Sequence, residues 1–178
     1  MSMLSLDAEV LYGSLRSQLH AWMPKFQQQP VSLVGVWSGG AWLAQRLHQD
    51  LALSGEYGVI SSALHRDDFD ERGMMAKRDV TRLPFEVDGR HIVLVDDVLH
   101  TGRTIRAVIN ELFDFGRPAS VMLAVLVDRF GRELPIEAAC AASKLTLPDN
   151  QRLSLKKNDD GHFSFQITQI AAAGEQPV

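Results

Sequence analysis

Apolar side chains recur along this chain in two different periods, and the changes between them predict alternating helices and strands. Residues 7–23 carry apolar side chains at helical spacing, with Asp7 placed as an N-cap, which predicts an amphipathic helix. The short β-branched run 31–36 is typical of a buried strand. Helical spacing resumes over 41–51. The first third of the chain therefore predicts a helix, a strand and a second helix.

The rest of the chain continues this alternation, apart from a charged stretch over residues 65–90. A turn at 158–161, with the sequence Asn-Asp-Asp-Gly, predicts a small C-terminal β-hairpin. The remaining predicted elements are strands at 57–64, 92–95 and 121–127 and a helix at 103–115. Strands that alternate with helices predict an α/β fold with a doubly wound, mostly parallel sheet. We expect one domain over residues 1–168 and a flexible tail over 169–178.

Composition and charge narrow the class of protein. The 178 residues are 46% hydrophobic and 22% charged, which is typical of one globular domain. A net charge of −4 gives no overall attraction to nucleic acid. Cys140 is the only cysteine, so the chain has no internal disulfide, and its small apolar neighbours indicate a buried, inert thiol. With no signal peptide or membrane span in the pattern, we expect a cytoplasmic protein without a membrane partner.

The strongest chemical signal is an acidic pair that follows the most apolar strand. Asp96 and Asp97 are separated by three residues from Thr101–Thr104, which opens the predicted helix. A helix N-terminus attracts an anion, the threonine hydroxyls add donors, and Gly102 permits close approach of the backbone. The two carboxylates would repel that anion, so we expect them to face ribose hydroxyls or a hydrated Mg²⁺. This order of groups favours a binding site for a phosphorylated sugar over a structural turn.

The same residues carry a resemblance to a known family. The stretch 93–104 resembles the phosphoribosyl pyrophosphate (PRPP) loop of type I phosphoribosyltransferases. Residues 93–118, 123–129 and 132–136 are similar to the bifunctional pyrimidine-operon attenuation regulator/uracil phosphoribosyltransferase family, and thinner similarity extends over 6–148. The resemblance implies transfer of ribose 5-phosphate from PRPP to N1 of uracil. The products are UMP and pyrophosphate, Mg²⁺ is the expected cofactor, and a homo-oligomer is expected.

The resemblance also implies roles for individual residues. Asp96 and Asp97 would bind the ribose hydroxyls and, directly or through water, Mg²⁺, and together with Arg66 they are the predicted catalytic residues. Asp128, Arg129 and Arg132 are assigned to the base. The predicted PRPP-binding residues are Asp96, Asp97, Val98, Leu99, His100, Thr101, Gly102, Arg103 and Thr104, together with Ser38 and Gly39.

Two regions bear on how the substrate's phosphates are held. Residues 65–90 match the place of a mobile hood in the family, and its cations are candidates for clamping phosphates: Arg66, Arg72, Lys77, Arg78 and Arg82. The stretch 35–40 matches the family's pyrophosphate site, but Trp37 and Gly39 stand where better-known members carry Lys and Arg. A backbone cradle at Ser38–Gly40 and a purely structural glycine turn are both consistent with this stretch.

Three functions stay open at this point. The first is an active uracil phosphoribosyltransferase. The second is a regulator that senses uridine nucleotides and binds the leader of pyrimidine-operon messenger RNA with little catalysis. The predicted first helix offers few cations for RNA: Arg16, His20 and Lys25. The third, an unrelated Mg²⁺-dependent phosphohydrolase, is the least favoured, because such enzymes commonly space their carboxylates differently.

Overall fold

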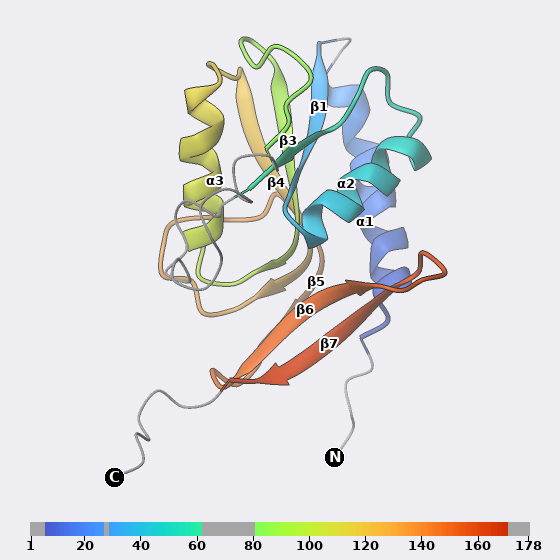
Figure 1. Ribbon diagram of the computed structural model, residues 1–178, viewed down its shortest axis with the longest axis vertical. Coiled ribbons are helices and arrows are strands. Elements are labelled where there is room, and N and C mark those ends of the chain that lie inside the picture. The colour runs from blue at the N-terminus through green and yellow to red at the C-terminus, as the bar shows by residue number, and fades with distance from the viewer. Residues whose placement is uncertain (1–5, 27–28, 62–80, 171–178) are drawn as a thin grey trace.

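A computed structural model describes residues 6–26, 29–61 and 81–170 of the chain. Its centre is a parallel five-stranded sheet in the order β2-β1-β3-β4-β5 (Figure 1). The strands are β1 (Val31–Val36), β2 (Gly58–Ile60), β3 (His91–Leu99), β4 (Ser120–Arg129) and β5 (Cys140–Leu145). The helices are α1 (Ala8–Trp22), α2 (Gly39–Asp50) and α3 (Arg103–Asp114), with a short 3-10 turn η1 (Met23–Phe26) after α1.

The helices cover both faces of this sheet, which confirms the predicted doubly wound α/β fold. Figure 1 shows α3 on one side and α1 with α2 on the other. Successive side chains of β3 pack against opposite helical layers, because side chains alternate between the two faces of a strand. Val93 and Val95 pack in the cluster that includes α1 and α2, while Ile92 and Leu94 pack in the cluster that includes α3. The continuous apolar run therefore reflects burial on both faces.

Two strands differ from the prediction. β3 does not end before the acidic pair, because Asp96 pairs with Val125 and the register continues to Leu99. β5 was not predicted at all, since its sequence, Cys-Ala-Ala-Ser-Lys-Leu, lacks the β-branched residues that mark strands. Pairing with β4 and burial against α1 form this strand.

The predicted C-terminal hairpin is confirmed. β6 (Gln151–Lys157) pairs antiparallel with β7 (Phe163–Gln169) in a separate two-stranded sheet. Its buried leucines, Leu153 and Leu155, pack in the same core cluster as α1. Its backbone is tied to α1 as well, because Glu9 accepts a 2.7 Å hydrogen bond from the Phe163 N–H. The hairpin is thus fastened to the sheet's helical layer and lies beside its carboxyl edge (Figure 1).

Some predictions fall outside the described residues. Residues 62–80 hold most of the predicted hood, and residues 171–178 most of the predicted tail. β7 continues through Gln169, one residue past the expected domain boundary. Within the described ranges, none of the helices has both the length and the apolar composition that crossing a bilayer requires.

Candidate active site

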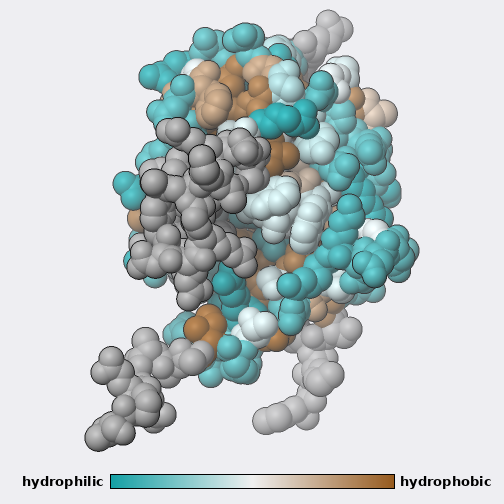
Figure 2. Space-filling model, viewed as in Figure 1, coloured by the Kyte–Doolittle hydropathy of each residue, from teal (hydrophilic) through white to brown (hydrophobic). Residues whose placement is uncertain are grey.

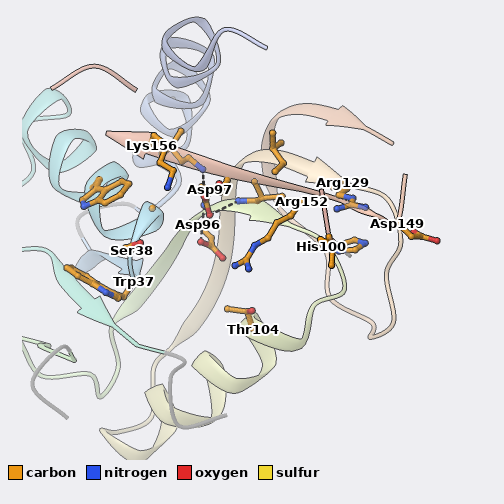
Figure 3. A pocket seen from close by; sticks show the side chains of 17 residues that line it. Trp37, Ser38, Asp96, Asp97, His100, Thr104, Arg129, Asp149, Arg152 and Lys156 are labelled. Atoms are coloured by element: carbon orange, nitrogen blue, oxygen red, sulfur yellow. Dashed lines mark hydrogen bonds between the residues drawn. The ribbon is translucent and has the colours of Figure 1, made fainter. Parts of the chain in front are cut away.

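A cavity of about 530 Å³ opens at the carboxyl edge of the sheet, between the sheet and the hairpin (Figure 3). This is where ligands bind in open α/β sheets. Its walls come from the β1–α2 turn, the end of β3, the start of α3, and β6. The lining residues are Trp37, Ser38, Gly39, Trp42, Asp96, Asp97, Val98, His100, Thr104, Arg129, Asp149, Arg152, Leu153, Ser154, Leu155, Lys156 and Ile170.

The acidic pair lies at the centre of this cavity, as predicted. Asp96 is buried, and its Oδ1 accepts a 2.9 Å hydrogen bond from the Asp97 N–H. Asp97 accepts two backbone N–H groups, from Val98 at Oδ1 (3.0 Å) and from Leu155 of β6 at Oδ2 (3.0 Å). The second bond links the catalytic candidate to the hairpin. The carboxylate oxygens of Asp97 have further lone pairs, so these two bonds leave acceptor sites on Asp97 for a ligand.

The predicted PRPP loop divides into residues that line the cavity and residues that support it. Besides the acidic pair, Val98, His100 and Thr104 line it, whereas Leu99 is buried in the α3 layer. Thr101, Gly102 and Arg103 are not among the lining residues.

The supporting residues hold the loop that leads into α3. The Thr101 carbonyl accepts N–H groups from Glu133 and Leu134, and Arg103 forms a 2.6 Å ion pair with Glu133. Gly102 is the N-cap of α3 with φ 92°, a conformation that favours glycine. These contacts fix the direction of the α3 N-terminus toward the cavity.

Of the three residues predicted to bind the base, the structure places one on the cavity wall. Only Arg129 lines the cavity. Its guanidinium donates to the carbonyls of Pro148 (2.9 Å) and Gln151 (2.7 Å), which ties the β5–β6 connection to β4. Arg132 instead pairs with Asp128 and donates to the His100 carbonyl. Asp128 and Arg132 therefore support the loop from behind.

His100 contributes a neutral side chain to the cavity wall. Burial lowers its pKa below the ordinary value, and the positive charge of Arg129 lowers the pKa further. Its ring also lies close to the backbone of the supporting loop, because a Cβ at Gly131 would come within 2.7 Å of His100 Nε2. Burial and the charge of Arg129 thus favour the uncharged form of this imidazole.

The β1–α2 turn forms the opposite wall, and close neighbours leave little space for a Cβ at its two glycines. A Cβ at Gly39 would lie 2.8 Å from both Cγ and Oδ2 of Asp97, and one at Gly40 would lie 2.1 Å from the Val95 carbonyl oxygen. Glycine is needed here for α2 to start against β3. The structure thus brings Ser38 and Gly39 next to the acidic pair, as predicted. Trp37 lines the same wall with 48% of its surface exposed.

Sequence reasoning missed the contribution of β6 to the cavity. Arg152, Ser154 and Lys156 alternate with buried leucines, and this period of two was the signal that could have placed them on one face. Of the cations proposed as phosphate clamps, Arg82 pairs with Glu56 at 2.8 Å and does not line the cavity. The others lie outside the described residues: Arg66, Arg72, Lys77 and Arg78.

The fold and the cavity define a class of protein. The chain matches the phosphoribosyl transferase domain family over residues 12–152. Solved structures with the same fold include a hypoxanthine-guanine phosphoribosyltransferase from Bacillus anthracis, with a TM-score of 0.62, 16% identity and 82% of each chain covered. A hypoxanthine phosphoribosyltransferase from Staphylococcus aureus gives 0.61 and 19% identity, covering 84% of this chain and 78% of that chain.

Two relatives give the narrower assignment. The bifunctional protein PyrR of Ralstonia nicotianae is 51% identical over 168 residues, which cover 93% of this chain and 96% of the relative. That of Nitrosococcus oceani is 44% identical over 165 residues, covering 92% and 93%. The chain belongs to the type I phosphoribosyltransferase family, in the group of bifunctional PyrR proteins.

Proposed function

We propose that this protein is a uracil phosphoribosyltransferase, which transfers ribose 5-phosphate from PRPP to N1 of uracil and releases pyrophosphate. The observation that carries the proposal is that Asp96 and Asp97 line one cavity together with Thr104, which lies in the first turn of α3. Family membership supports the reaction class, and the similarity to PyrR relatives supports the pyrimidine base.

The geometry suits this reaction because its transition state needs positioning more than a nucleophile. The carboxylates of Asp96 and Asp97 are suited to hydrogen-bond ribose hydroxyls and to favour positive charge that develops at C1 of the sugar. The α3 N-terminus and the Thr104 hydroxyl are suited to the 5′-phosphate. A substrate held at both points is oriented for attack by the base, and this orientation is itself a large part of catalysis.

Mg²⁺ belongs to the proposal as a partner of the substrate. Among the described residues, no group of three or more His, Cys, Asp or Glu side chains is gathered to hold a metal. Mg²⁺ is commonly held by one or two carboxylates together with substrate phosphates and water, and the carboxylates of Asp96 and Asp97 on the cavity wall suit that arrangement. When bound, the ion would neutralise charge on the departing pyrophosphate.

The direct test is an assay of UMP formation from uracil, PRPP and Mg²⁺, with hypoxanthine, guanine and cytosine as alternative bases. We expect product from uracil, and turnover lower by orders of magnitude in Asp97→Asn assayed below its melting temperature. Lys157→Gln, an exposed substitution outside the cavity, is the matched control and keeps wild-type turnover. Product from a purine alone would contradict uracil as the base but leave the phosphoribosyltransferase reaction standing. Wild-type turnover in Asp97→Asn would contradict the catalytic role of the acidic pair.

A second function is favoured by the names of the relatives, which are called bifunctional. We propose that the protein also regulates pyrimidine genes in response to uridine nucleotides by binding leader RNA. A filter-binding titration with pyrimidine-operon leader RNA at stated salt, with and without UMP, tests this. Equal affinity for leader and scrambled RNA, or no response to UMP, contradicts it.

A further inference from the structure

Strand β6 presents a row of polar side chains to the cavity. Along the strand, Leu153 and Leu155 are buried in the core, and the residues between and beside them have the opposite orientation. Arg152, Ser154 and Lys156 line the cavity, and Leu153 and Leu155 between them also contribute to its wall (Figure 3). The hairpin therefore adds two cations to a site in which the end of β3 carries two carboxylates.

Neither cation has a partner in the described part of the protein. The side chains of Arg152 and Lys156 form no hydrogen bond or ion pair with a described residue. Arg129, by contrast, is occupied by backbone carbonyls of the β5–β6 connection. The two β6 side chains are the cations of the cavity wall that are available to an anionic ligand.

The two cations face different parts of the cavity. In Figure 3 the Arg152 guanidinium points between Asp96 and Thr104, toward the α3 N-terminus. The Lys156 ammonium lies over the side of the cavity formed by Asp97 and Ser38. Four residues along a strand separate their Cα atoms by roughly 13 Å. Cations that extend from two separate positions of one strand into different parts of the cavity suit a substrate with anionic groups at both ends.

We propose that β6 is a second phosphate-binding element of this site, in which Lys156 binds the pyrophosphate of PRPP and Arg152 binds its 5′-phosphate. The proposal deepens the proposed function and rests on it. It accounts for how an acidic pair tolerates a substrate with three phosphate groups, because each carboxylate is opposed by a cation across the cavity. It also assigns the hairpin a role in ligand binding beyond covering the sheet edge.

The β1–α2 turn explains why the cations come from β6. A side chain at Gly39 would displace the Asp97 carboxylate, because its Cβ would lie 2.8 Å from Asp97 Oδ2, and Trp37 brings no charge. The turn offers the Ser38 hydroxyl and backbone N–H groups but no ammonium or guanidinium. Lys156 approaches the same side of the cavity from the hairpin, so it supplies there the charge that the turn lacks.

The experiment measures binding of each end of the substrate separately, by calorimetry with inorganic pyrophosphate plus Mg²⁺ and with ribose 5-phosphate. The variants are Lys156→Gln, Arg152→Gln, and Lys157→Gln as the control on the same strand outside the cavity. We expect Lys156→Gln to weaken pyrophosphate about tenfold and to leave ribose 5-phosphate unchanged, and Arg152→Gln to do the reverse, as loss of one charge-assisted bond predicts. Lys157→Gln changes neither.

Two further variants distinguish a specific contact from nonspecific electrostatic attraction of the ligand. Lys156→Arg retains pyrophosphate binding, and Trp37→Lys in the Lys156→Gln background restores it, because Trp37 faces the same part of the cavity and is half exposed. The proposal is overturned if Lys156→Gln binds pyrophosphate as tightly as Lys157→Gln does, or if the wild-type protein binds neither ligand. It is also overturned if Lys156→Gln and Arg152→Gln weaken both ligands equally, or if each weakens the ligand assigned to the other. If the variants show the predicted binding pattern but the wild-type protein makes no UMP, the proposed uracil phosphoribosyltransferase activity is wrong and the phosphate-binding role of β6 stands.

Discussion

The hydrogen bond between Asp97 and Leu155 makes a catalytic candidate part of the protein's stability. Asp97 accepts one backbone N–H on each carboxylate oxygen, both at 3.0 Å. Asparagine at this position keeps a single acceptor oxygen and turns an NH₂ group toward the other N–H. Asp97→Asn therefore leaves one backbone donor without an acceptor and places two donors against each other.

The cost of this change follows from the missing acceptor. A buried donor left unsatisfied costs about 1–3 kcal/mol. In a protein of this size each kcal/mol lowers Tm by about 2–4 °C, so about 2 kcal/mol corresponds to a fall of about 4–8 °C. Because the Leu155 N–H donates to Asp97 in the native protein and would lose this acceptor, hydrogen exchange at the Leu155 amide should also become faster.

Asp149→Asn is the matched control for this prediction. Asp149 lines the same cavity and loses the same charge on substitution, but it is exposed and its side chain forms no hydrogen bond with a described residue. Thermal unfolding followed by circular dichroism measures both variants. If Asp97→Asn melted within about 1 °C of Asp149→Asn, and the Leu155 amide exchanged at the wild-type rate, the proposed link would be refuted.

Three further changes follow from individual contacts. Gly39→Ala should lower UMP formation steeply, because its Cβ would lie 2.8 Å from the Asp97 carboxylate; an activity assay with Gly13→Ala as control, where nothing lies within 4 Å, checks this. Cys140 is 2% exposed and burial raises its pKa, so the native thiol should resist alkylation at pH 7 and react fully after unfolding. The hydrogen bond from Arg46 lowers the pKa of Glu9, so its stabilisation is present above its ordinary pKa of 4.5 and is lost as pH falls through the lower folded-state pKa. Acid titration of stability should therefore be flatter in Glu9→Gln.

Hydrophobic periodicity and the order of polar groups were enough to predict the α/β fold of this protein and the position of its acidic pair. The run 92–95 indicated a strand buried on two faces, and both core clusters confirm it. Asp7 was predicted as the N-cap of the first helix, and its side chain accepts from Glu9 and Val10 N–H. The acidic pair and the threonines around the start of α3 predicted phosphate-sugar chemistry, because strand ends and helix starts meet at one edge of a parallel sheet.

Local sequence failed where contacts between distant segments decide the outcome. β5 has little intrinsic preference for a strand and forms because β4 presents an edge and α1 covers it. The ion pair between Asp128 and Arg132 was likewise not predicted; of the three residues assigned to the base, Arg129 is the one that lines the cavity.

The sequence by itself determined most of the elements and which strand end carries the acidic pair, because hydrophobic period and helix-start signals act over a few residues. Only the tertiary structure decided what lies opposite that strand end. Gly39 touches Asp97 across 58 positions of chain, and the hairpin brings Lys156 to the same cavity. No local pattern encodes these distances, since they depend on how α2 and β6 pack against the carboxyl edge of the sheet.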